Sequence, residues 1–249
     1  MKDLLGQRIK ENYENRSKQF LPRRNYTIIR IDGKTFSTYT KGLKKPFCDG
    51  LMEDMDLTAA YLCKNIMGAK FAFVQSDEIS ILITDFENIN QQAWFDNNVQ
   101  KMCSISASMA TAKFNQLRMQ RFQDFNYKIA EFDSRVFQIP QKTEVDNYFR
   151  WRQQDTIRNS IQSVAYSMYS HSEINNKNTN EMQEMIFQKG VNWNDFKPRY
   201  KRGRIIVKEL YQKENLDKTF TVRTRWVSTE PPIFTEQPEY LDLLIPNNR

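Results

Sequence analysis

The stretch FAFVQSDEISILI, residues 71–83, places two acids, Asp77 and Glu78, in the middle of an apolar run. The segments KFAFVQ and ISILIT on either side have the composition of buried strands, so the run predicts a β-hairpin with SDE at its turn. Charged side chains are costly to place between buried strands. The two carboxylates therefore indicate either a function at the hairpin tip or a turn that is exposed to solvent.

The segments around this hairpin predict the order β-α-β-β-α-β. YTIIRID (26–32) has the pattern of a buried strand that ends in Asp32, residues 49–66 have the spacing of an amphipathic helix, residues 97–122 indicate a second helix and AEFDSRVFQIP (130–140) a further strand. This order is that of an α+β, ferredoxin-like layer, an antiparallel sheet with helices on one face. In such a layer the return strand of the hairpin lies beside the first strand, so Asp32 and Asp77 are expected to converge.

The rest of the chain predicts additional helices and a second β-hairpin. Residues 143–170 indicate a long helix with Thr143 as its N-cap, and TNEMQEMIFQKG (179–190) a short helix with Gly190 just past its end. RIIVKELY (204–211) and KTFTVRTRWV (218–227) form a candidate hairpin. We expect residues 1–140 to form the core and residues 141–249 an extension that packs on it and is not an independent domain.

Composition excludes several classes of protein. The 249 residues are 39% hydrophobic and 13% aromatic, which is enough for a folded core, and the mean hydropathy of −0.73 indicates a polar surface. No window approaches the ~18 apolar residues of a membrane helix, and the first residues lack the apolar region of a signal peptide. We therefore expect a cytoplasmic protein without a membrane partner, with an organellar location left open.

The catalytic residue types are also restricted. Cys48, Cys63 and Cys103 have no CxxC spacing, which predicts reduced thiols. The single histidine, His171, lies in a polar stretch typical of a solvated helix end, whereas a Ser-His-Asp triad needs an imidazole base. Any chemistry is expected to depend on carboxylates, bound metal and cationic side chains.

Positive charge is concentrated in two segments. Residues 197–225 contain ten Lys or Arg and three acids, a net charge of +7 that equals the charge of the whole chain. Residues 97–123 contain four Lys or Arg and no acid. This distribution favours a polyanion such as nucleic acid as partner, although a basic solvated surface is the alternative.

The motif RIDGKTF (30–36) is not a phosphate-binding P-loop, because Ile28 stands where that motif requires its first glycine. What remains is an acid at a strand end followed by Gly33, which allows a sharp turn or a close approach to a ligand. Asp32, Asp77 and Glu78 together have the composition of a two-metal site. Mg²⁺ prefers oxygen ligands, and two ions can hold the attacking and leaving oxygens of a phosphoryl displacement.

Four segments, RIDGKTFSTYTKGLKKPF (30–47), QSDEIS (75–80), FDSRVF (132–137) and YFRWRQQD (148–155), resemble the tRNA-histidine guanylyltransferase superfamily, which extends RNA in the 3′–5′ direction. The similarity runs from about Asp3 to about Lys208. It implies a polymerase palm-like catalytic core, two Mg²⁺ ions, ATP that activates a 5′-monophosphate, and GTP or another nucleoside triphosphate whose 3′-hydroxyl displaces the activating group. It also implies tRNA as partner and, by analogy, a homotetramer.

The resemblance assigns residues to these roles. Asp32, Asp77 and Glu78 become catalytic, with Asp32, the Gly33 carbonyl and Asp77 as metal ligands. The incoming triphosphate is held by backbone N–H groups of the turn at 34–37, so the nucleotide-binding residues are Asp32, Gly33, Lys34, Thr35, Phe36, Ser37, Lys45, Ser76 and Asp77. The RNA-binding residues are expected to be Lys101, Arg158, Asn159, Arg199, Lys201 and Arg202. Ordinary solvated lysines are the alternative for Lys45 and Lys101, and a polar helix face is the alternative for Arg158 and Asn159.

One departure from the family pattern bears on the substrate. Members that add the extra guanosine to histidine tRNA continue after W-R-Q-x-D with His-Ile-Asn-Asn-Leu-Tyr-Asn, whereas this chain reads TIRNSIQS (156–163) and keeps only Asn159 in register. The chain thereby resembles the Thg1-like branch, which repairs 5′-truncated tRNA by copying the opposite strand. We expect template-dependent 3′–5′ nucleotide addition to tRNA.

Three alternatives remain open. The first is tRNA-histidine guanylyltransferase activity on the same core. The second is a non-catalytic RNA-binding protein, which the intact acids Asp32, Asp77 and Glu78 argue against. The third is a nucleotide cyclase, which the basic segment 197–225 disfavours because a cyclase needs no surface for a polyanion.

Overall fold

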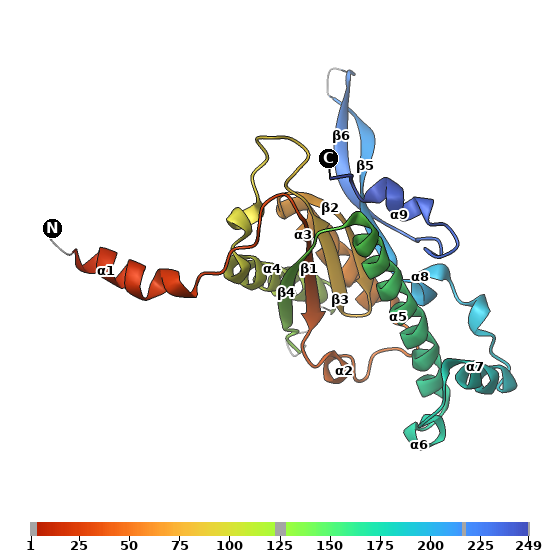
Figure 1. Ribbon diagram of the computed structural model, residues 1–249. Helices are drawn as coiled ribbons and strands as arrows, with labels where there is room; N and C mark the ends of the chain where they lie inside the picture. The colour runs from red at the N-terminus through yellow and green to blue at the C-terminus, as the bar shows by residue number, and fades with distance from the viewer. Residues whose placement is uncertain (1–3, 123–127, 216–217, 249) are drawn as a thin grey trace.

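The computed structural model describes residues 4–122, 128–215 and 218–248 (Figure 1). Six strands form one sheet in the order β4-β1-β3-β2-β5-β6, and every neighbouring pair is antiparallel. The strands are β1 (Tyr26–Gly33), β2 (Ala69–Gln75), β3 (Glu78–Ile83), β4 (Phe132–Ile139), β5 (Arg204–Glu214) and β6 (Phe220–Thr229). The first four have the ferredoxin-like order 4-1-3-2, so the predicted α+β layer is confirmed.

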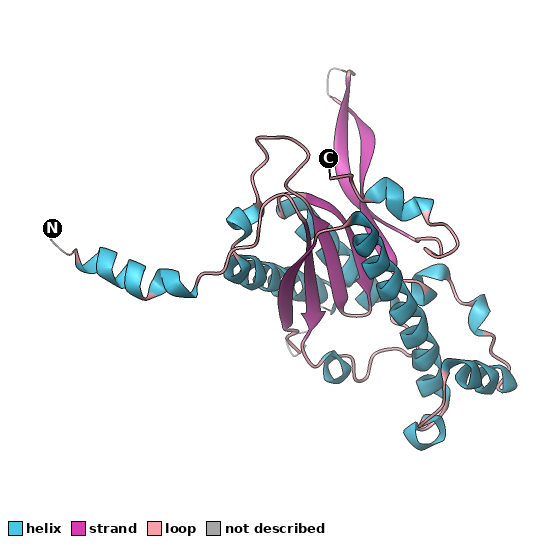
Figure 2. Cartoon of the chain, viewed as in Figure 1, coloured by secondary structure: helices cyan, strands magenta, loops and turns pink. Residues whose placement is uncertain are grey.

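Helices cover both faces of this sheet (Figure 2). On one face lie α3 (Asp49–Asn65) and α4 (Val99–Phe122), which pack against Ile29 and Ile31 of β1. On the other face α5 (Lys142–Met168) and α9 (Glu239–Leu244) pack against Tyr26 and Ile28. Successive residues of β1 serve opposite cores because strand side chains alternate between faces.

The segment beyond residue 140 takes part in the same sheet, since β5 pairs with β2 from Phe71↔Val207 to Val74↔Arg204. The division at residue 140 stays a prediction. Helix α5 begins earlier than expected, because the Gln141 carbonyl already accepts bonds from the Glu144 and Val145 amides. Thr143 is therefore not its N-cap, and that prediction is wrong.

A small satellite core lies at the far end of α5. Ile161 and Val164 of α5 pack there against Met182 and Ile186 of α7 (Thr179–Gln188). Gly190 follows α7 with φ +79°, the left-handed conformation expected after a helix end. The remaining helices are α1 (Leu5–Asn12), α2 (Phe36–Tyr39), α6 (His171–Ile174) and α8 (Pro198–Lys201), with 3₁₀ turns at Glu14–Ser17, Trp94–Asn97 and Trp193–Asp195.

The hairpin β5–β6 extends well beyond the sheet (Figure 1). Only its base, Arg204–Val207, pairs with β2, whereas the pairing of β5 with β6 continues to Glu214↔Phe220. We call the part from Lys208 to Arg225 the arm. Among the described residues no helix has the length and apolar character needed to span a membrane.

Candidate active site

Strand register brings Asp32 and Asp77 to the same end of the sheet, as the strand order predicts. Ile31 of β1 pairs with Ile79 of β3, so Asp32 lies beside the β2–β3 turn that carries Asp77. A β-carbon on Gly33 would lie 2.8 Å from Asp77 Oδ2 and 2.3 Å from Phe36 Cδ2. Glycine is therefore required at position 33, because the Asp77 carboxylate and the Phe36 ring already fill the space of a side chain.

Both carboxylates are held where ionisation is unfavourable. Burial, together with the charges of Asp32 and Glu78, raises the pKa of Asp77 to about 6, against the opposing hydrogen bond from Ser76. Burial raises the pKa of Asp32 as well, and the charges of Glu78 and Asp133 add to this effect while Arg30 and Arg135 oppose it. A cation bound between the two carboxylates would favour their ionised forms.

The donor set fits Mg²⁺ that binds together with substrate. In the part of the chain that the structure describes, no group of three or more His, Cys, Asp or Glu is placed to hold a metal ion. Asp32 and Asp77 supply two carboxylates next to the Gly33 backbone. Mg²⁺ usually takes one or two carboxylates and completes its shell with substrate phosphates and water.

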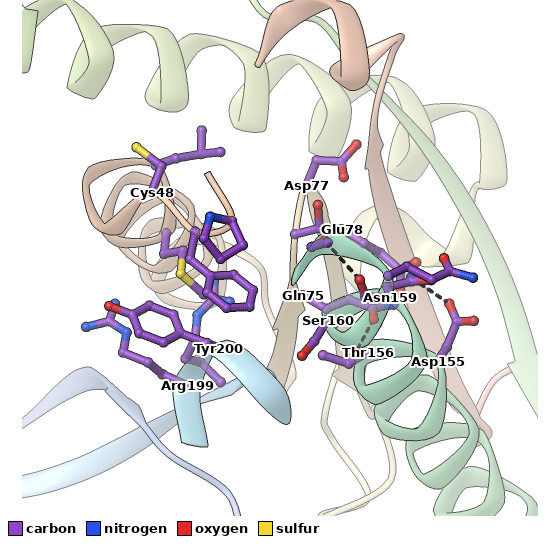
Figure 3. A pocket seen from close by; sticks show the side chains of 18 of the residues that line it. Cys48, Gln75, Asp77, Glu78, Asp155, Thr156, Asn159, Ser160, Arg199 and Tyr200 are labelled. Carbon is purple, nitrogen blue, oxygen red and sulfur yellow. Dashed lines mark hydrogen bonds between the residues drawn. The ribbon is translucent and has the colours of Figure 1, made fainter. Parts of the chain in front are cut away.

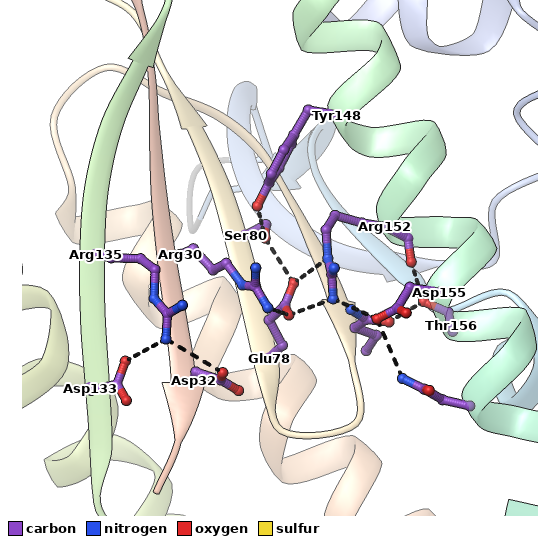
Figure 4. Close-up of polar contacts among 12 residues, drawn as sticks. Arg30, Asp32, Glu78, Ser80, Asp133, Arg135, Tyr148, Arg152, Asp155 and Thr156 are labelled. Atoms are coloured by element: carbon purple, nitrogen blue, oxygen red, sulfur yellow. Dashed lines mark hydrogen bonds and ion pairs between the residues drawn. The ribbon is translucent and has the colours of Figure 1, made fainter. Parts of the chain in front are cut away.

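The carboxylate of the third acid, Glu78, contacts two arginines, Arg30 and Arg152 (Figure 4). It is only 5% exposed, and its Oε1 and Oε2 accept hydrogen bonds from Arg152 at 2.8 and 2.7 Å. Arg30 of β1 lies 2.7 Å from Oε2, and Ser80 donates to Oε1 at 3.1 Å. Both oxygens are thus engaged, so the structure brings two of the three predicted acids together and binds the third to arginines.

The arginine cluster contains residues to which the sequence analysis gave no role. Arg152 lies over the Trp151 ring at 4.4 Å and donates to Asp155 at 3.0 Å, and Tyr148 hydrogen-bonds Ser80 at 2.8 Å. Tyr148, Arg152 and Asp155 recur at helical spacing within YFRWRQQD, a pattern that could have placed them on one face of α5. The cluster joins β1, β3 and α5 next to the acidic pair, in the lining of the same cleft.

A cleft of about 470 Å³ opens beside Asp32 and Asp77 (Figure 3). Its walls come from the residues before and within α3 (Pro46, Phe47, Cys48, Leu51, Met52), from α5 (Asp155, Thr156, Asn159, Ser160, Ser163, Tyr166) and from α8 (Arg199, Tyr200). One wall is largely apolar, with Phe47 stacked on Tyr200 at 4.7 Å, and the wall formed by α5 is polar. A cleft of this volume and mixed lining suits a nucleotide-sized ligand.

The turn predicted to hold the triphosphate follows β1 directly. Thr35 has a left-handed conformation, with φ 49°, and Phe36 is buried against Phe114 and Phe132, so only the backbone of Phe36 is available to a ligand. The Lys34 amide donates to the Glu131 carbonyl at 2.8 Å, and its Nζ lies 2.6 Å from Glu131 Oε2. Two further predicted residues, Ser76 at the tip and Lys45 before Pro46, are exposed near the rim of the cleft.

The predicted RNA-binding residues are not brought together in one place. Asn159 and Arg199 line the cleft, Arg158 forms an ion pair with Asp155, and Lys101 lies in the first turn of α4 and does not line the cleft. Arg202 is partly exposed.

Lys201 requires a correction. It is only 7% exposed, and its Nζ donates to the Asn194 carbonyl at 2.6 Å and lies over the Trp193 ring at 5.1 Å. Burial lowers the pKa of this lysine. Its side chain serves the packing of α8, so the structure does not place it on a surface for RNA.

The sequence of the chain is similar to sequences of known proteins. A family model described as tRNAHis guanylyltransferase matches residues 6–140. A probable tRNA(His) guanylyltransferase of Dictyostelium discoideum is 26% identical over 88% of this chain and 90% of its own length.

Solved structures match nearly the whole chain. A bacterial tRNA(His) guanylyltransferase-like protein in complex with ATP is 43% identical, with a TM-score of 0.88 over 98% of this chain and 99% of that one. A second such structure, in complex with GTP, is 44% identical, with a TM-score of 0.82 over 97% of this chain and 98% of that one. These matches confirm the predicted palm-like α+β fold.

Proposed function

Since this chain belongs to the tRNAHis guanylyltransferase family, we propose that this nucleotidyltransferase adds nucleotides to the 5′ end of tRNA under the direction of the opposing strand. The observation that carries the proposal is the α5 wall of the cleft. Thr156, Asn159, Ser160 and Ser163 line it, at the positions where the resemblance would place the histidine motif of guanosine-adding members. The chain's one histidine, His171, lies beyond α5 and does not line this cleft.

The proposed reaction has two steps. The 5′-phosphate of the RNA first attacks the α-phosphorus of ATP, which releases pyrophosphate and leaves an adenylylated 5′ end. The 3′-hydroxyl of the incoming nucleotide then attacks the 5′-phosphorus and displaces AMP. Complexes of the bacterial neighbours with ATP and with GTP support both nucleotides as ligands of such a cleft.

Different residues of this chain would bind the metal, bind the triphosphate and position the site. Asp32, the Gly33 carbonyl and Asp77 would hold Mg²⁺, which when bound neutralises phosphate charge and lowers the pKa of the attacking hydroxyl. Within the turn at 34–37, the backbone N–H groups of residues 35–37 would bind the incoming triphosphate, because the first amides of a helix have no partner within it, whereas the Lys34 amide already donates to the Glu131 carbonyl. Arg30, Glu78 and Arg152 would keep α5 and the strand ends in register around the acidic pair.

Changing the template base tests this proposal. With a 5′-truncated tRNA whose first unpaired opposing base is C, we expect GTP to be the preferred substrate, and a change of that base to A should switch the preference to UTP. Several tRNA species should react alike, because RNA helices are recognised mostly by shape and backbone. The assay measures incorporation of each nucleotide in the presence of ATP and Mg²⁺, with Asp77→Asn protein as the inactive control.

Two results would replace the proposal by an alternative. Addition of G alone, whatever the template, and only to histidine tRNA would establish the guanylyltransferase activity instead. Binding of tRNA without any incorporation would favour a non-catalytic RNA-binding protein.

We further propose that one face of the arm contacts tRNA. In the β5–β6 register Tyr211 pairs with Arg223 and Glu209 with Arg225, so these side chains share a face with Lys213. Arg225 lies 2.7 Å from Glu209 and over the Tyr211 ring at 5.2 Å, whereas Lys213 and Arg223 are exposed. An exposed basic face with an aromatic ring is suited to an RNA backbone.

Replacing both exposed cations of this face, Lys213→Gln with Arg223→Gln, should weaken tRNA binding and its dependence on salt. The logarithm of the binding constant falls linearly with the logarithm of the salt concentration. Every phosphate that the variant no longer neutralises should make this slope less steep by roughly 0.7–0.9. Binding is measured by titration at several salt concentrations. The matched control, Lys64→Gln with Lys113→Gln on helices α3 and α4, should leave the slope unchanged; equal slopes for both double variants would remove the arm from the RNA interface.

A homotetramer stays a prediction by family analogy.

A further inference from the structure

A buried ion pair joins α3 and α4, the two helices that cover one face of the sheet. Asp54 of α3 and Arg118 of α4 are 1% and 2% exposed, and Arg118 Nη1 donates to Asp54 Oδ2 at 3.0 Å. Neither residue lines the cleft. Buried ion pairs contribute little net stability because desolvation opposes their attraction, so the geometry that this pair enforces is of more interest than its strength.

The same arginine reaches the turn that follows β1. Arg118 Nε donates to the Tyr39 hydroxyl at 3.2 Å, and Tyr39 is the last residue of α2. The Tyr39 ring packs on Phe36 at 4.8 Å and on Phe114 at 5.8 Å, and its amide donates to the Thr35 carbonyl at 3.3 Å. Tyr39 thus contacts both Thr35 and Phe36, the central residues of the turn.

Helix α2 depends on such contacts for its position. It consists of four residues, a single turn, and a single helical turn is not stable by itself in water. The α3 side of the pair leads to the cleft, because Leu51 and Met52 lie within one helical turn of Asp54 and line it. Asp54, Arg118 and Tyr39 therefore form a continuous polar connection between a wall of the cleft and the turn at 34–37.

We propose that Asp54, Arg118 and Tyr39 are positioning residues that set the turn at 34–37 for the triphosphate of the incoming nucleotide. The inference rests on the proposed function, in which that turn binds the triphosphate of the incoming nucleotide. Tyr39 acts through the Thr35 carbonyl and the Phe36 ring, and Arg118 acts through Tyr39. Loss of the connection weakens binding of the incoming nucleotide and leaves activation of the RNA 5′ end unchanged.

Arg121 provides a matched control within the same cluster. It also pairs with Asp54, with Nε at 3.0 Å from Oδ2 and Nη2 at 2.8 Å from Oδ1, and its Nη2 lies 2.8 Å from Glu53. Its contacts therefore fasten α4 to α3 without the Tyr39 hydroxyl. A purely structural role of the cluster predicts similar effects from Arg118 and Arg121, whereas a positioning role separates them.

The test measures the second step alone, with tRNA that already carries an adenylylated 5′ end and with GTP as the varied substrate. Tyr39→Phe removes only the hydroxyl, and Arg118→Lys keeps a positive charge near Asp54 but loses the Nε–H bond. Each should raise the KM for GTP about 5–10-fold, the effect of losing one typical hydrogen bond, with kcat within about twofold. The double variant should raise KM no further than either single one, since both remove the same bond.

The control and a direct binding measurement complete the test. Arg121→Gln should lower the melting temperature and leave the KM for GTP within about twofold. The dissociation constant for GTP with Mg²⁺ should rise in Tyr39→Phe as KM does. An unchanged KM in Tyr39→Phe, or an equal rise in Arg121→Gln, would overturn the inference. Wild-type protein that binds GTP normally but adds nothing to RNA would overturn the proposed function alone, and the binding comparison would still decide the inference; wild-type protein that binds no GTP would overturn both.

Discussion

Asp77→Asn is expected to reduce nucleotide addition by at least about 100-fold, the size of effect seen when one group that stabilises transition-state charge is removed. The substitution keeps the shape of the side chain and removes one of the two carboxylates that we propose as Mg²⁺ ligands. Binding of tRNA should persist, because affinity for RNA depends mainly on basic side chains. Addition is measured with truncated tRNA, ATP and GTP, and binding by titration of the same tRNA.

Asp96→Asn serves as the control for Asp77→Asn. Asp96 is exposed, with 78% of its side chain accessible, and lies at the other end of the sheet. This variant should add nucleotides at the wild-type rate. A fully active Asp77→Asn protein would contradict the assignment of the acidic pair.

Glu78→Ala is expected to destabilise the fold by about 3–5 kcal/mol, the typical cost of removing one partner from a buried ion pair. The substitution removes the carboxylate that Arg152 and Arg30 share. Arg152 is 3% exposed, and the Arg30 side chain is largely buried, so neither charge is well solvated. Activity measured below the melting temperature should fall less than in Asp77→Asn, since both oxygens of Glu78 are engaged by Arg152 and Arg30. Denaturation by urea gives the free energy of unfolding.

The matched comparison for Glu78→Ala is Glu209→Ala. Glu209 forms an exposed ion pair with Arg225 on the arm, at 2.7 Å, and its removal should cost no more than about 1 kcal/mol. A Glu78→Ala protein as stable as wild type yet inactive would show that Glu78 acts directly on substrate or metal.

The strand order and the meeting of Asp32 with Asp77 could be predicted because they follow from the alternation of apolar runs and the geometry of an antiparallel hairpin. The direction of Glu78 could not. The β1–β3 register, which pairs Ile31 with Ile79, places Glu78 opposite Asp32, so its contacts and not its place in the strand separate it from the acidic pair. Its partner Arg152 lies 74 residues away on α5, a distance that no local pattern covers.

The basic segment 197–225 led to a different error, the prediction that Lys201 binds RNA. A lysine within a run of charged residues is usually exposed, yet Lys201 is buried because α8 turns its side chain toward the Asn194 carbonyl. Successive side chains of the arm point to opposite faces. Its sequence therefore mixes the basic side chains of one face with the apolar Leu210, Phe220 and Val222 of the other. Net charge identified the segment, and only the register identified the face.

The position of the acidic pair has a cost that a cation would offset. An acid whose pKa is raised from 3.8 to about 6 on folding favours the folded state below pH 3.8, and this contribution is lost as the pH rises through about 6. At pH 7.5 the ionised Asp77 therefore destabilises the metal-free fold by up to about 3 kcal/mol. An exchange of stability for a site that binds Mg²⁺ would explain the buried Asp77 at the hairpin tip.

Thermal unfolding of wild-type and Asp77→Asn protein at pH 7.5, in EDTA and in Mg²⁺, measures that exchange directly. In EDTA we expect the variant to melt up to about 6–12 °C above wild type, because each kcal/mol corresponds to roughly 2–4 °C in a chain of this size. Addition of Mg²⁺ with GTP should raise the melting temperature of wild type more than that of the variant and narrow or reverse the difference. A variant that melts below wild type in EDTA, together with an equal shift of both proteins on adding Mg²⁺ and GTP, would contradict a metal site built on Asp32 and Asp77.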